Sequence, residues 1–379
     1  MKILYDFQAF SIQRFGGVSR YFCELINHFG DDPDLVWELP IRWSDNEYLC
    51  NLKKSDGGAE GVTGSCRGFL KRLNFRGKRR MYQLKNRPWA IERIRTSEYD
   101  IFHPTFYDDY FLKYLFTKPF VLTIHDMIHE IYPDFFSPAD PTSNRKKILV
   151  QKATRIIAIS KTTKKDLIDV FKVPEDKITV IYHGNSLAAD VKPVDFQPIK
   201  NLPIPYLLFV GARVGYKNFY FFLRSIAALL LANPELRVVC AGSVFTAEEN
   251  RFFKSLGLTG RIRQYAVDDA CLTYLYQNAR AFVFPSLYEG FGFPVLEAFS
   301  CGCPAILSMA GSLPEIGGDA AIYFDPKDGY AIREAVSRVI GDEDIRKELI
   351  RKGKTRANDF SWEKTARMTK QVYAEVLAC

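Results

Sequence analysis

The sequence predicts an α/β protein with two domains, each built around a parallel sheet. Short apolar runs that are typical of buried strands alternate with helical segments along the whole chain, as parallel sheets require. A chain of 379 residues is longer than one ordinary hydrophobic core, so two domains are expected. The alternation is interrupted by a stretch with little periodicity that contains Pro193, Pro198, Pro203 and Pro205, which indicates a linker at residues 191–205.

Each half of the chain contains a series of strand-like runs. In the first half they lie at residues 2–6, 35–41, 101–104, 120–125, 155–160 and 178–183. In the second half they lie at residues 206–211, 236–241, 262–266, 281–285, 305–308 and 321–324. Residues 44–68 are polar and glycine-rich, which indicates a loop, and helical stretches at residues 342–354 and 362–377 end the chain. The predicted domains are therefore residues 1–190 and 206–358, followed by a final helix within residues 359–379.

Composition favours a globular protein of the cytoplasm. The hydrophobic and charged fractions, 47% and 25%, are ordinary for a folded domain. The first residues reach Asp6 after three apolar positions, so no signal peptide is expected, and no apolar run approaches the length of a membrane span. The cysteines are scattered through apolar or helical segments, which predicts reduced thiols and not a disulfide framework.

The most informative segment runs from Glu289 to Glu297 and follows the strand at residues 281–285. Gly290 and Gly292 let the backbone approach a ligand closely, and Pro294 suits the first turn of a helix. A strand, a glycine turn and a helix N-terminus together form an anion site, and two nearby carboxylates can bind hydroxyl groups. This combination fits a nucleotide-sugar diphosphate. A strand, loop and helix with two solvated glutamates is the simpler interpretation.

With its Glu-x7-Glu spacing, the segment from residue 285 to residue 298 resembles the signature of retaining, nucleotide-sugar-dependent glycosyltransferases of group 1, or family 4, with the GT-B fold. The resemblance extends over nearly the whole chain and is nearest to bacterial mannosyltransferase-like enzymes of surface-polysaccharide assembly. It implies two Rossmann-like domains that face each other across a cleft, with a last helix that crosses back to the N-terminal domain. It also implies site roles: Glu289 in catalysis, Gly290, Phe291 and Gly292 at the donor diphosphate, and Glu297 at the donor nucleoside.

A second candidate lies after the strand at residues 206–211, where Arg213 and Lys217 stand four residues apart. A diphosphate leaving group gains negative charge as its bond to the sugar breaks, and fixed cations stabilise that charge most in the transition state. A surface turn with two solvated cations is the alternative. In the family that the chain resembles, this pair binds the donor diphosphate. Since the two cations supply the charge that a metal would bring, we expect no metal and no cofactor, and we interpret the Asp-Asp pairs at 31–32, 108–109 and 268–269 as caps or turns.

In the first half, His125 ends the strand at residues 120–125 and is followed by Asp126. Ligands bind at the carboxyl edge of a doubly wound sheet, although a lone strand histidine is more often structural. The resemblance implies that His125 lies against the donor sugar and orients it. It also implies that the acceptor hydroxyl attacks from the face that the diphosphate leaves, while a phosphate oxygen takes its proton, so that no protein nucleophile exists. His103 and His129 are weaker, structural or rim candidates.

Two further segments of the first half belong to the predicted site. Gly16 and Gly17 open a helix, where glycine permits close backbone approach to a ligand. They match the first glycine-rich loop of the family, which contacts the donor phosphate or the acceptor, so Gly17 and Arg20 join the site. His183 and Asn185 close the last strand of this half and either face the cleft or form a strand-ending turn.

The net charge of +8 is concentrated in residues 67–95, where Glu92 is the only acidic residue and Phe69, Phe75, Tyr82 and Trp89 interleave with the cations. Such a segment favours an anionic surface, namely lipid headgroups, a pyrophosphate-linked acceptor or nucleic acid, and a solvated helix face is an equally good interpretation. We expect peripheral contact of this segment with an anionic membrane, where a glycan or lipid-linked acceptor is presented, and no nucleic-acid partner.

Other functional classes fit less well. A sugar-nucleotide epimerase shares the architecture, but its acid and base carboxylates are not identifiable in this sequence. A nicotinamide dehydrogenase requires G-x-G-x-x-G after its first strand, which residues 16–21 do not supply. A nucleic-acid-binding module would use the basic segment, yet no recognised binding motif accompanies it. The favoured donor is a GDP- or UDP-linked sugar, with both bases left open.

Overall fold

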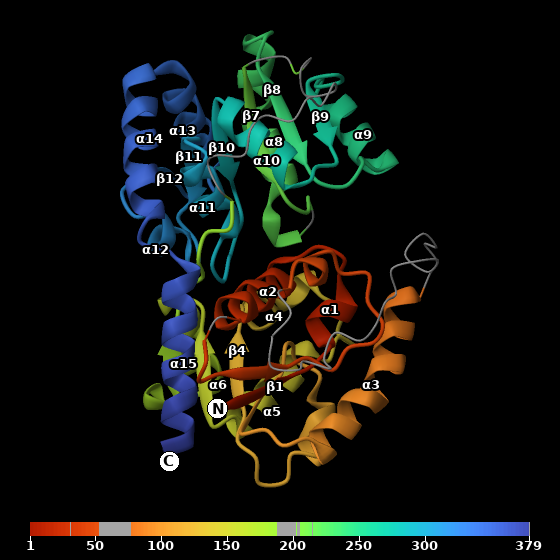
Figure 1. Ribbon diagram of the computed structural model, residues 1–379. Coiled ribbons are helices and arrows are strands. Elements are labelled where there is room, and N and C mark those ends of the chain that lie inside the picture. The colour runs from red at the N-terminus through yellow and green to blue at the C-terminus, as the bar shows by residue number, and fades with distance from the viewer. Residues whose placement is uncertain (31, 53–76, 188–201, 203–204, 214, 379) are drawn as a thin grey trace. The chain divides into compact units, whose positions relative to one another are not determined.

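The computed structural model describes residues 1–379 apart from residues 31, 53–76, 188–201, 203–204, 214 and 379 (Figure 1). Two compact units divide the chain: Met1–Gly184 with Trp362–Cys379, and Asn185–Ser361. Both units consist of parallel strands and helices, which confirms the predicted α/β class. Most of the expected linker at 191–205 and of the expected loop at 44–68 lies outside the described residues.

The strands of the first unit form two short parallel sheets that meet side by side. Their orders are β2-β1-β3 and β4-β5-β6, and an isolated bridge between Phe102 and Phe120 sets β4 beside β3. Each strand falls within a run expected from the sequence. The bounds are β1 Lys2–Tyr5, β2 Val36–Glu38, β3 Ile101–His103, β4 Val121–Ile124, β5 Arg155–Ala158 and β6 Ile178–Val180.

The C-terminal helix α15 (Trp362–Ala378) belongs to this first unit, as the resemblance implied. The buried hydroxyl of Tyr373 lies 3.0 Å from the Tyr5 hydroxyl and 2.6 Å from Nδ1 of His103, so the helix is tied to β1 and β3. The other helices are α1 Gln8–Ile12, α2 Gly17–Phe29, α3 Lys78–Thr96, α4 Ile128–Ile131, α5 Thr142–Lys152 and α6 Lys161–Phe171, with 3₁₀ turns η1 Tyr48–Asn51, η2 Asp109–Lys113, η3 Pro133–Phe135 and η4 Glu175–Lys177.

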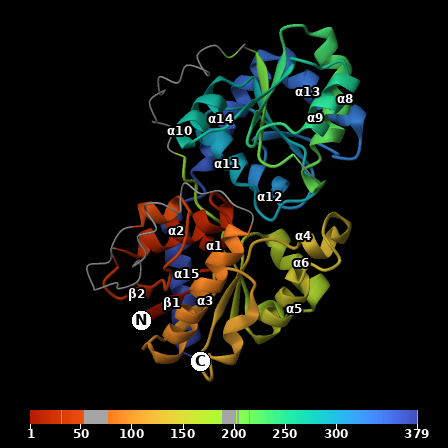
Figure 2. The ribbon, with the colours of Figure 1, turned by 90° about the vertical axis from the view of Figure 1, so that its right-hand side faces the viewer.

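The second unit has a six-stranded parallel sheet in the order β12-β11-β10-β7-β8-β9. One face is covered by α8 and α13, whose apolar residues share a core with the strands (Figure 2). The strands are β7 Tyr206–Val210, β8 Arg237–Ala241, β9 Ile262–Tyr265, β10 Ala281–Phe284, β11 Ala305–Ser308 and β12 Ala321–Phe324. The helices are η5 Gly215–Lys217, α8 Phe219–Ala232, α9 Ala247–Ser255, α10 Asp269–Asn278, α11 Phe293–Ser300, α12 Leu313–Gly317, α13 Gly329–Gly341 and α14 Glu343–Ala357.

The strand order reverses once in each unit, and this reversal positions the site. In the second unit β7 lies between β8 and β10, so the chain proceeds to one side through β8 and β9 and to the other through β10, β11 and β12. In the first unit β1 lies between β2 and β3 in the same way. Ligands of open α/β sheets bind outside the carboxyl ends of the strands at such a reversal. The loops after β7 and β10, and those after β1 and β3, are therefore the places to examine.

Candidate functional site

In the second unit, the loops that follow β7 and β10 are joined to each other. The two strands are parallel neighbours, with Leu207 opposite Ala281, so their carboxyl ends lie side by side. The backbone N–H of Leu287 donates to the carbonyl of Tyr216 over 2.7 Å, and the Asn218 amide donates to the carbonyl of Pro285 over 3.1 Å. The structure thus brings together two motifs that are far apart in the sequence.

The centre of this arrangement is an ion pair between Lys217 and Glu289. Nζ of Lys217 lies 2.7 Å from Oε1 of Glu289, and the side chains are 17% and 10% exposed. The ammonium also lies 5.1 Å from the centre of the Phe284 ring, at cation–π distance. A lysine ammonium has three donors, and Glu289 occupies one of them, so the cation can still bind an anionic ligand.

The backbone of Glu289 is fixed by a loop that the sequence motifs did not indicate. The hydroxyl of Ser312 donates to the carbonyl of Glu289 over 2.9 Å and to that of Phe291 over 2.8 Å. Gly311 has a φ of +59°, and a Cβ at this position would lie 2.7 Å from the backbone nitrogen and oxygen of Glu289. Gly311 and Ser312 therefore hold the carboxylate-bearing loop, and any side chain at position 311 would push it away.

Arg213 has a partner that the sequence did not predict. Its side chain is buried, and Nε donates to Oε1 of Glu249 over 2.6 Å, while Nη2 donates to the carbonyl of Ser243 over 2.8 Å. Glu249 forms a capping box with Thr246 at the start of α9. Although burial raises the pKa of Glu249, hydrogen bonds from Arg213 and Thr246 lower it below its usual value. Nη1 of Arg213 is buried and has no hydrogen-bond partner among the described residues, which leaves its two N–H donors for a ligand.

The glycine turn that opens α11 is formed as expected. Gly292 has a φ of +105°, and a Cβ there would lie 2.9 Å from Cδ2 of Leu313, so no other residue fits without strain. The Phe291 ring is buried against Phe360, so this residue can contact a diphosphate only through its backbone. Glu297 is 5% exposed and accepts a hydrogen bond from the Tyr276 hydroxyl over 3.1 Å.

In the first unit, His125 follows β4 and is 8% exposed. Its backbone N–H donates to the hydroxyl of Tyr107 over 2.8 Å, and its ring contacts Tyr21 edge-on. Burial lowers the pKa of His125 from 6.5 to about 4, so the ring is neutral at physiological pH. Nε2 is buried and has no hydrogen-bond partner among the described residues. A neutral imidazole with an unused nitrogen suits contact with a sugar hydroxyl.

Asp126 is held by a lysine that the sequence analysis did not single out. The fully buried Lys146 donates to the Asp126 backbone carbonyl over 3.0 Å and to Oε2 of Glu130 over 2.7 Å, and its Nζ lies 3.6 Å from the Asp126 carboxylate. Burial raises the pKa of Asp126, but the Lys146 ammonium and other nearby groups lower it by more. The pKa of Asp126 is therefore below its usual value. The role of Lys146 is to fix the segment after His125.

The remaining predicted residues of the first unit divide into two groups. His183 is buried, its ring is stacked on Trp362 of α15, and burial with the nearby His125 lowers its pKa well below 6.5. Gly16 and Gly17 start α2 as expected, and the guanidinium of Arg20 lies 5.9 Å from the Tyr48 ring. His183, Gly16, Gly17 and Arg20 therefore remain candidate site residues.

The remaining expectations concern a residue at the boundary of the two units, two caps and a histidine. Asn185 lies in the second unit, where its amide donates to Ser300 at the end of α11. Asp108 caps η2 and Asp268 caps α10, as expected. His103 is enclosed between Tyr373 and Thr123, with a pKa that burial lowers to about 3.

The described part of the basic segment is α3. Arg79, Arg80, Lys85 and Leu84 are exposed, Leu84 by 64%. Tyr82, by contrast, is fully buried, and Trp89 lies beneath the guanidinium of Arg42 at 3.7 Å. Tyr82 is therefore not available to an external surface, and residues 67–76 lie outside the described part. Among the described residues, no helix is both long and apolar enough to cross a bilayer.

Comparisons with known proteins match both units. The family model described as "Glycosyltransferase Family 4" matches residues 15–188, and the model "Glycosyl transferases group 1" matches residues 192–356. The O-antigen chain mannosyltransferase B of Escherichia coli is 30% identical over 311 residues, which cover 78% of this chain and 78% of that protein. The O-antigen chain mannosyltransferase RfbU of Salmonella typhimurium is 27% identical over 219 residues, which cover 58% of this chain and 60% of that protein.

Solved structures share the two-domain fold. The sucrose-phosphate synthase of Thermosynechococcus elongatus aligns with a TM-score of 0.77 at 20% identity and covers 100% of this chain and 99% of its own. The Anabaena protein HepE in complex with UDP-glucose aligns with a TM-score of 0.72 at 16% identity, covering 99% of this chain and 100% of its own. At these identities the likeness extends to the fold alone.

Proposed function

Because the chain belongs to the group 1, or family 4, glycosyltransferases with the GT-B fold, we propose that it transfers a sugar from a nucleoside diphosphate to a saccharide acceptor with retention of anomeric configuration. The observation that carries the proposal is the Lys217–Glu289 pair at the strand-order reversal of the six-stranded sheet in the second unit. That edge holds a cation for a diphosphate and a carboxylate for sugar hydroxyls. The proposed donor is a GDP- or UDP-linked sugar.

The charged groups of the second unit suit the leaving diphosphate. As the bond between the sugar C1 and the phosphate oxygen breaks, negative charge accumulates on the diphosphate. Lys217 and the unpaired Nη1 of Arg213 are donors already held in place by Glu289 and Glu249, so they need no reorganisation during the reaction. With these cations in place, the proposal includes no metal ion and no cofactor.

The proposed bond changes need no protein nucleophile. The acceptor oxygen forms its bond to C1 on the face from which the diphosphate departs, and the acceptor proton moves to a phosphate oxygen. Glu289 and the neutral His125 orient the sugar and are not themselves altered. Retention then follows from attack and departure on one face.

The relatives suggest which sugar and which product are involved. Proteins named as O-antigen chain mannosyltransferases match most of this chain or a large part of it. We therefore propose mannose as the transferred sugar and a growing surface polysaccharide, free or lipid-linked, as the acceptor. The proposed place of action is the cytoplasm, at the inner face of the membrane.

Peripheral membrane contact through α3 belongs to the same proposal. Its exposed cations Arg79 and Arg80 lie about one turn before the exposed Leu84, a combination that suits an anionic bilayer. The double variant Arg79→Ser with Arg80→Ser is expected to bind anionic liposomes roughly 30-fold more weakly, at about 1 kcal/mol for each cation. The control removes Lys347 and Arg351 from the exposed face of α14. Equal binding of liposomes by the two variants, or no binding by the wild type at low salt, would contradict membrane contact through α3.

A donor panel tests the enzymatic proposal. The purified protein is incubated with GDP-mannose, UDP-glucose, UDP-galactose and UDP-N-acetylglucosamine, each with a mannose-terminated octyl glycoside, and nucleotide release is followed. We expect release from GDP-mannose and a new glycosidic bond with the anomeric configuration of the donor, as read by NMR coupling constants. An inverted product would contradict retention, and no transfer from any donor would contradict the proposal.

A further inference from the structure

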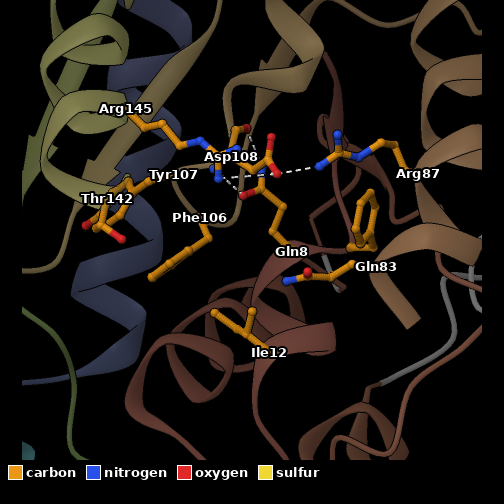
Figure 3. A pocket seen from close by; sticks show the side chains of 10 residues that line it. Gln8, Ile12, Gln83, Arg87, Phe106, Tyr107, Asp108, Thr142 and Arg145 are labelled. Atoms are coloured by element: carbon orange, nitrogen blue, oxygen red, sulfur yellow. Dashed lines mark hydrogen bonds and ion pairs between the residues drawn. The ribbon is translucent and has the colours of Figure 1, made fainter. Parts of the chain in front are cut away.

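A cavity with polar and aromatic walls lies at the strand-order reversal of the first unit, apart from the residues assigned so far. It has a volume of about 120 Å³, which is room for several water molecules. Part of its wall comes from Gln8 directly after β1 and from Phe106, Tyr107 and Asp108 after β3 (Figure 3). Since β1 and β3 are the parallel neighbours at which the strand order reverses, the fold itself favours a ligand here.

The polar groups of the cavity are fixed in place before any ligand binds. Oε1 of Gln8 accepts from the backbone N–H of Asp108 over 2.7 Å, and its amide donates to the buried carboxylate of Asp6 over 2.8 Å. Arg87 and Arg145 approach Asp108 from opposite sides, as Figure 3 shows. Planar amide, carboxylate and guanidinium groups therefore surround one space in a defined geometry.

Several of these groups keep hydrogen-bonding capacity for a ligand. The guanidinium of Arg145 lies 3.5 Å from Asp108 and 3.7 Å from Asp109, beyond ordinary hydrogen-bond distance. The side-chain amide of Gln83 has no hydrogen-bond partner among the described residues. Arg145 and Gln83 can thus donate to, and Gln83 can accept from, a ligand that carries hydroxyl groups.

The charge and shape of the cavity favour a neutral sugar. The two guanidinium groups are balanced by the carboxylates of Asp108 and Asp109, and the Asp6 carboxylate lies behind Gln8, so the cavity has no excess positive charge to attract a phosphate. The rings of Phe106 and Tyr107 lie 4.5 Å apart and supply an aromatic wall. A pyranose matches both features, because it carries hydroxyl groups at its edge and apolar C–H groups on its faces.

One wall of the cavity is bonded directly to the candidate catalytic histidine. The hydroxyl of Tyr107 accepts the backbone N–H of His125 over 2.8 Å, and Lys146, next to Arg145 on α5, bonds the carbonyl of Asp126. A ligand against Tyr107 therefore lies next to the segment that presents His125. This connection sets the cavity apart from a surface hollow with no relation to the reaction.

We propose that this cavity binds a neutral sugar residue of the acceptor, with Gln83 and Arg145 bonding its hydroxyl groups and Phe106 packing on its face. The inference rests on the proposed function, because it names where the acceptor of that reaction binds. It adds a specificity subsite whose residues differ from those of the donor site.

The test measures acceptor and donor kinetics separately in Gln83→Ala and Arg145→Gln. Both side chains are partly exposed, and circular dichroism checks that both variants fold. Each substitution is expected to raise the KM for the mannose-terminated octyl glycoside about tenfold, which corresponds to the loss of one hydrogen bond to a charged or amide group. The KM for the donor and the slow hydrolysis of the donor without acceptor should stay at wild-type values. Gln371→Ala on α15 and Arg333→Gln on α13, both exposed, are the matched controls.

The outcomes separate this inference from the proposed function. A raised acceptor KM with an unchanged donor KM supports the subsite, whereas variants that behave like the controls, or that raise the donor KM instead, overturn it. If the wild type transfers no sugar at all, the proposed function fails, and the cavity is then tested by saturation-transfer NMR with octyl α-mannoside alone. Ring-proton signals that weaken in both variants but not in the controls support the subsite. Their absence from the wild type overturns it.

Discussion

At the strand-order reversal of the second unit the candidate residues are charged and paired, whereas in the first unit the central candidate, which follows β4, is a neutral histidine. Lys217 is bonded to Glu289 over 2.7 Å, and Arg213 to Glu249 over 2.6 Å. His125 is also buried, but burial lowers its pKa to about 4 and its Nε2 has no partner among the described residues. The carboxyl edge of a parallel sheet therefore carries charged pairs in the second unit and a neutral histidine in the first unit.

The difference follows from what each edge has to bind. A buried cation needs a partner, and the two glutamates hold Lys217 and Arg213 ready for a ligand that carries negative charge. A neutral imidazole can meet a sugar hydroxyl without the desolvation of a charge. We infer that the edge with the Lys217 and Arg213 ion pairs (the paired edge) binds the diphosphate. The edge with His125 (the neutral edge) binds saccharide groups.

The largest effect is expected where a buried charged pair is broken. Arg213→Ala leaves Glu249 buried without its main partner and should lower the free energy of unfolding by about 3–5 kcal/mol. Urea denaturation provides the measurement. The control, Arg351→Ala, removes an exposed ion pair to Glu348 on α14 and should cost about 0–1 kcal/mol. Equal stability of the two variants would show that the Arg213–Glu249 pair does not organise the second edge.

The pair at the centre of the second edge should affect turnover more than folding. Lys217→Ala removes a cation aimed at the leaving group, and loss of one preorganised electrostatic contact typically lowers the rate about 10²–10³-fold. Glu289→Gln keeps the size of the side chain while it removes the charge, and it should also lower kcat. Steady-state kinetics with saturating acceptor measure both. Lys347→Ala on α14 is the matched control, and a Lys217 variant with the kinetics of that control would exclude the residue from the site.

The strands were predictable because each buried strand is a short apolar run, and Lys217 and Glu289 were singled out as candidates because they stand in local motifs. Contacts between distant elements were not. Glu249 pairs with Arg213 from a helix cap, and Tyr107 reaches His125 from another loop, and neither contact leaves a local pattern. The burial of Tyr82, by contrast, follows from helical spacing, since it shares the buried face of α3 with Asn86, Ala90 and Ile94.

The neutral edge predicts a dependence of stability on pH. His125 has a folded pKa of about 4 against 6.5 when unfolded, so the unfolded chain binds more protons between these values. Its contribution is complete above about pH 6.5 and is lost as the pH falls toward 4, at about 1.4 kcal/mol per pH unit. His125→Gln should show a correspondingly shallower loss than the wild type in denaturation curves at pH 7, 6 and 5. His28→Gln, at the exposed end of α2, is the control. Parallel curves for His125→Gln and the wild type would contradict a buried neutral ring.

The smallest effect is expected from metal removal. Since Lys217 and Arg213 are proposed to balance the diphosphate charge, EDTA should leave transfer unchanged. Activity assays with and without the chelator, followed by added Mg²⁺ or Mn²⁺, provide the comparison. Activity that is lost with EDTA and restored by either ion would mean that the paired edge needs a metal after all.

Calorimetric titration of GDP and UDP into the wild type and Lys217→Ala tests the central claim most directly, because it measures diphosphate binding without acceptor or turnover. We expect one of the two nucleotides to bind the wild type and to bind the variant roughly 10–100-fold more weakly, the loss of one charge-assisted contact. Equal affinity for the two proteins, or no binding of either nucleotide to the wild type, would contradict the assignment of the β7–β10 edge to the donor diphosphate.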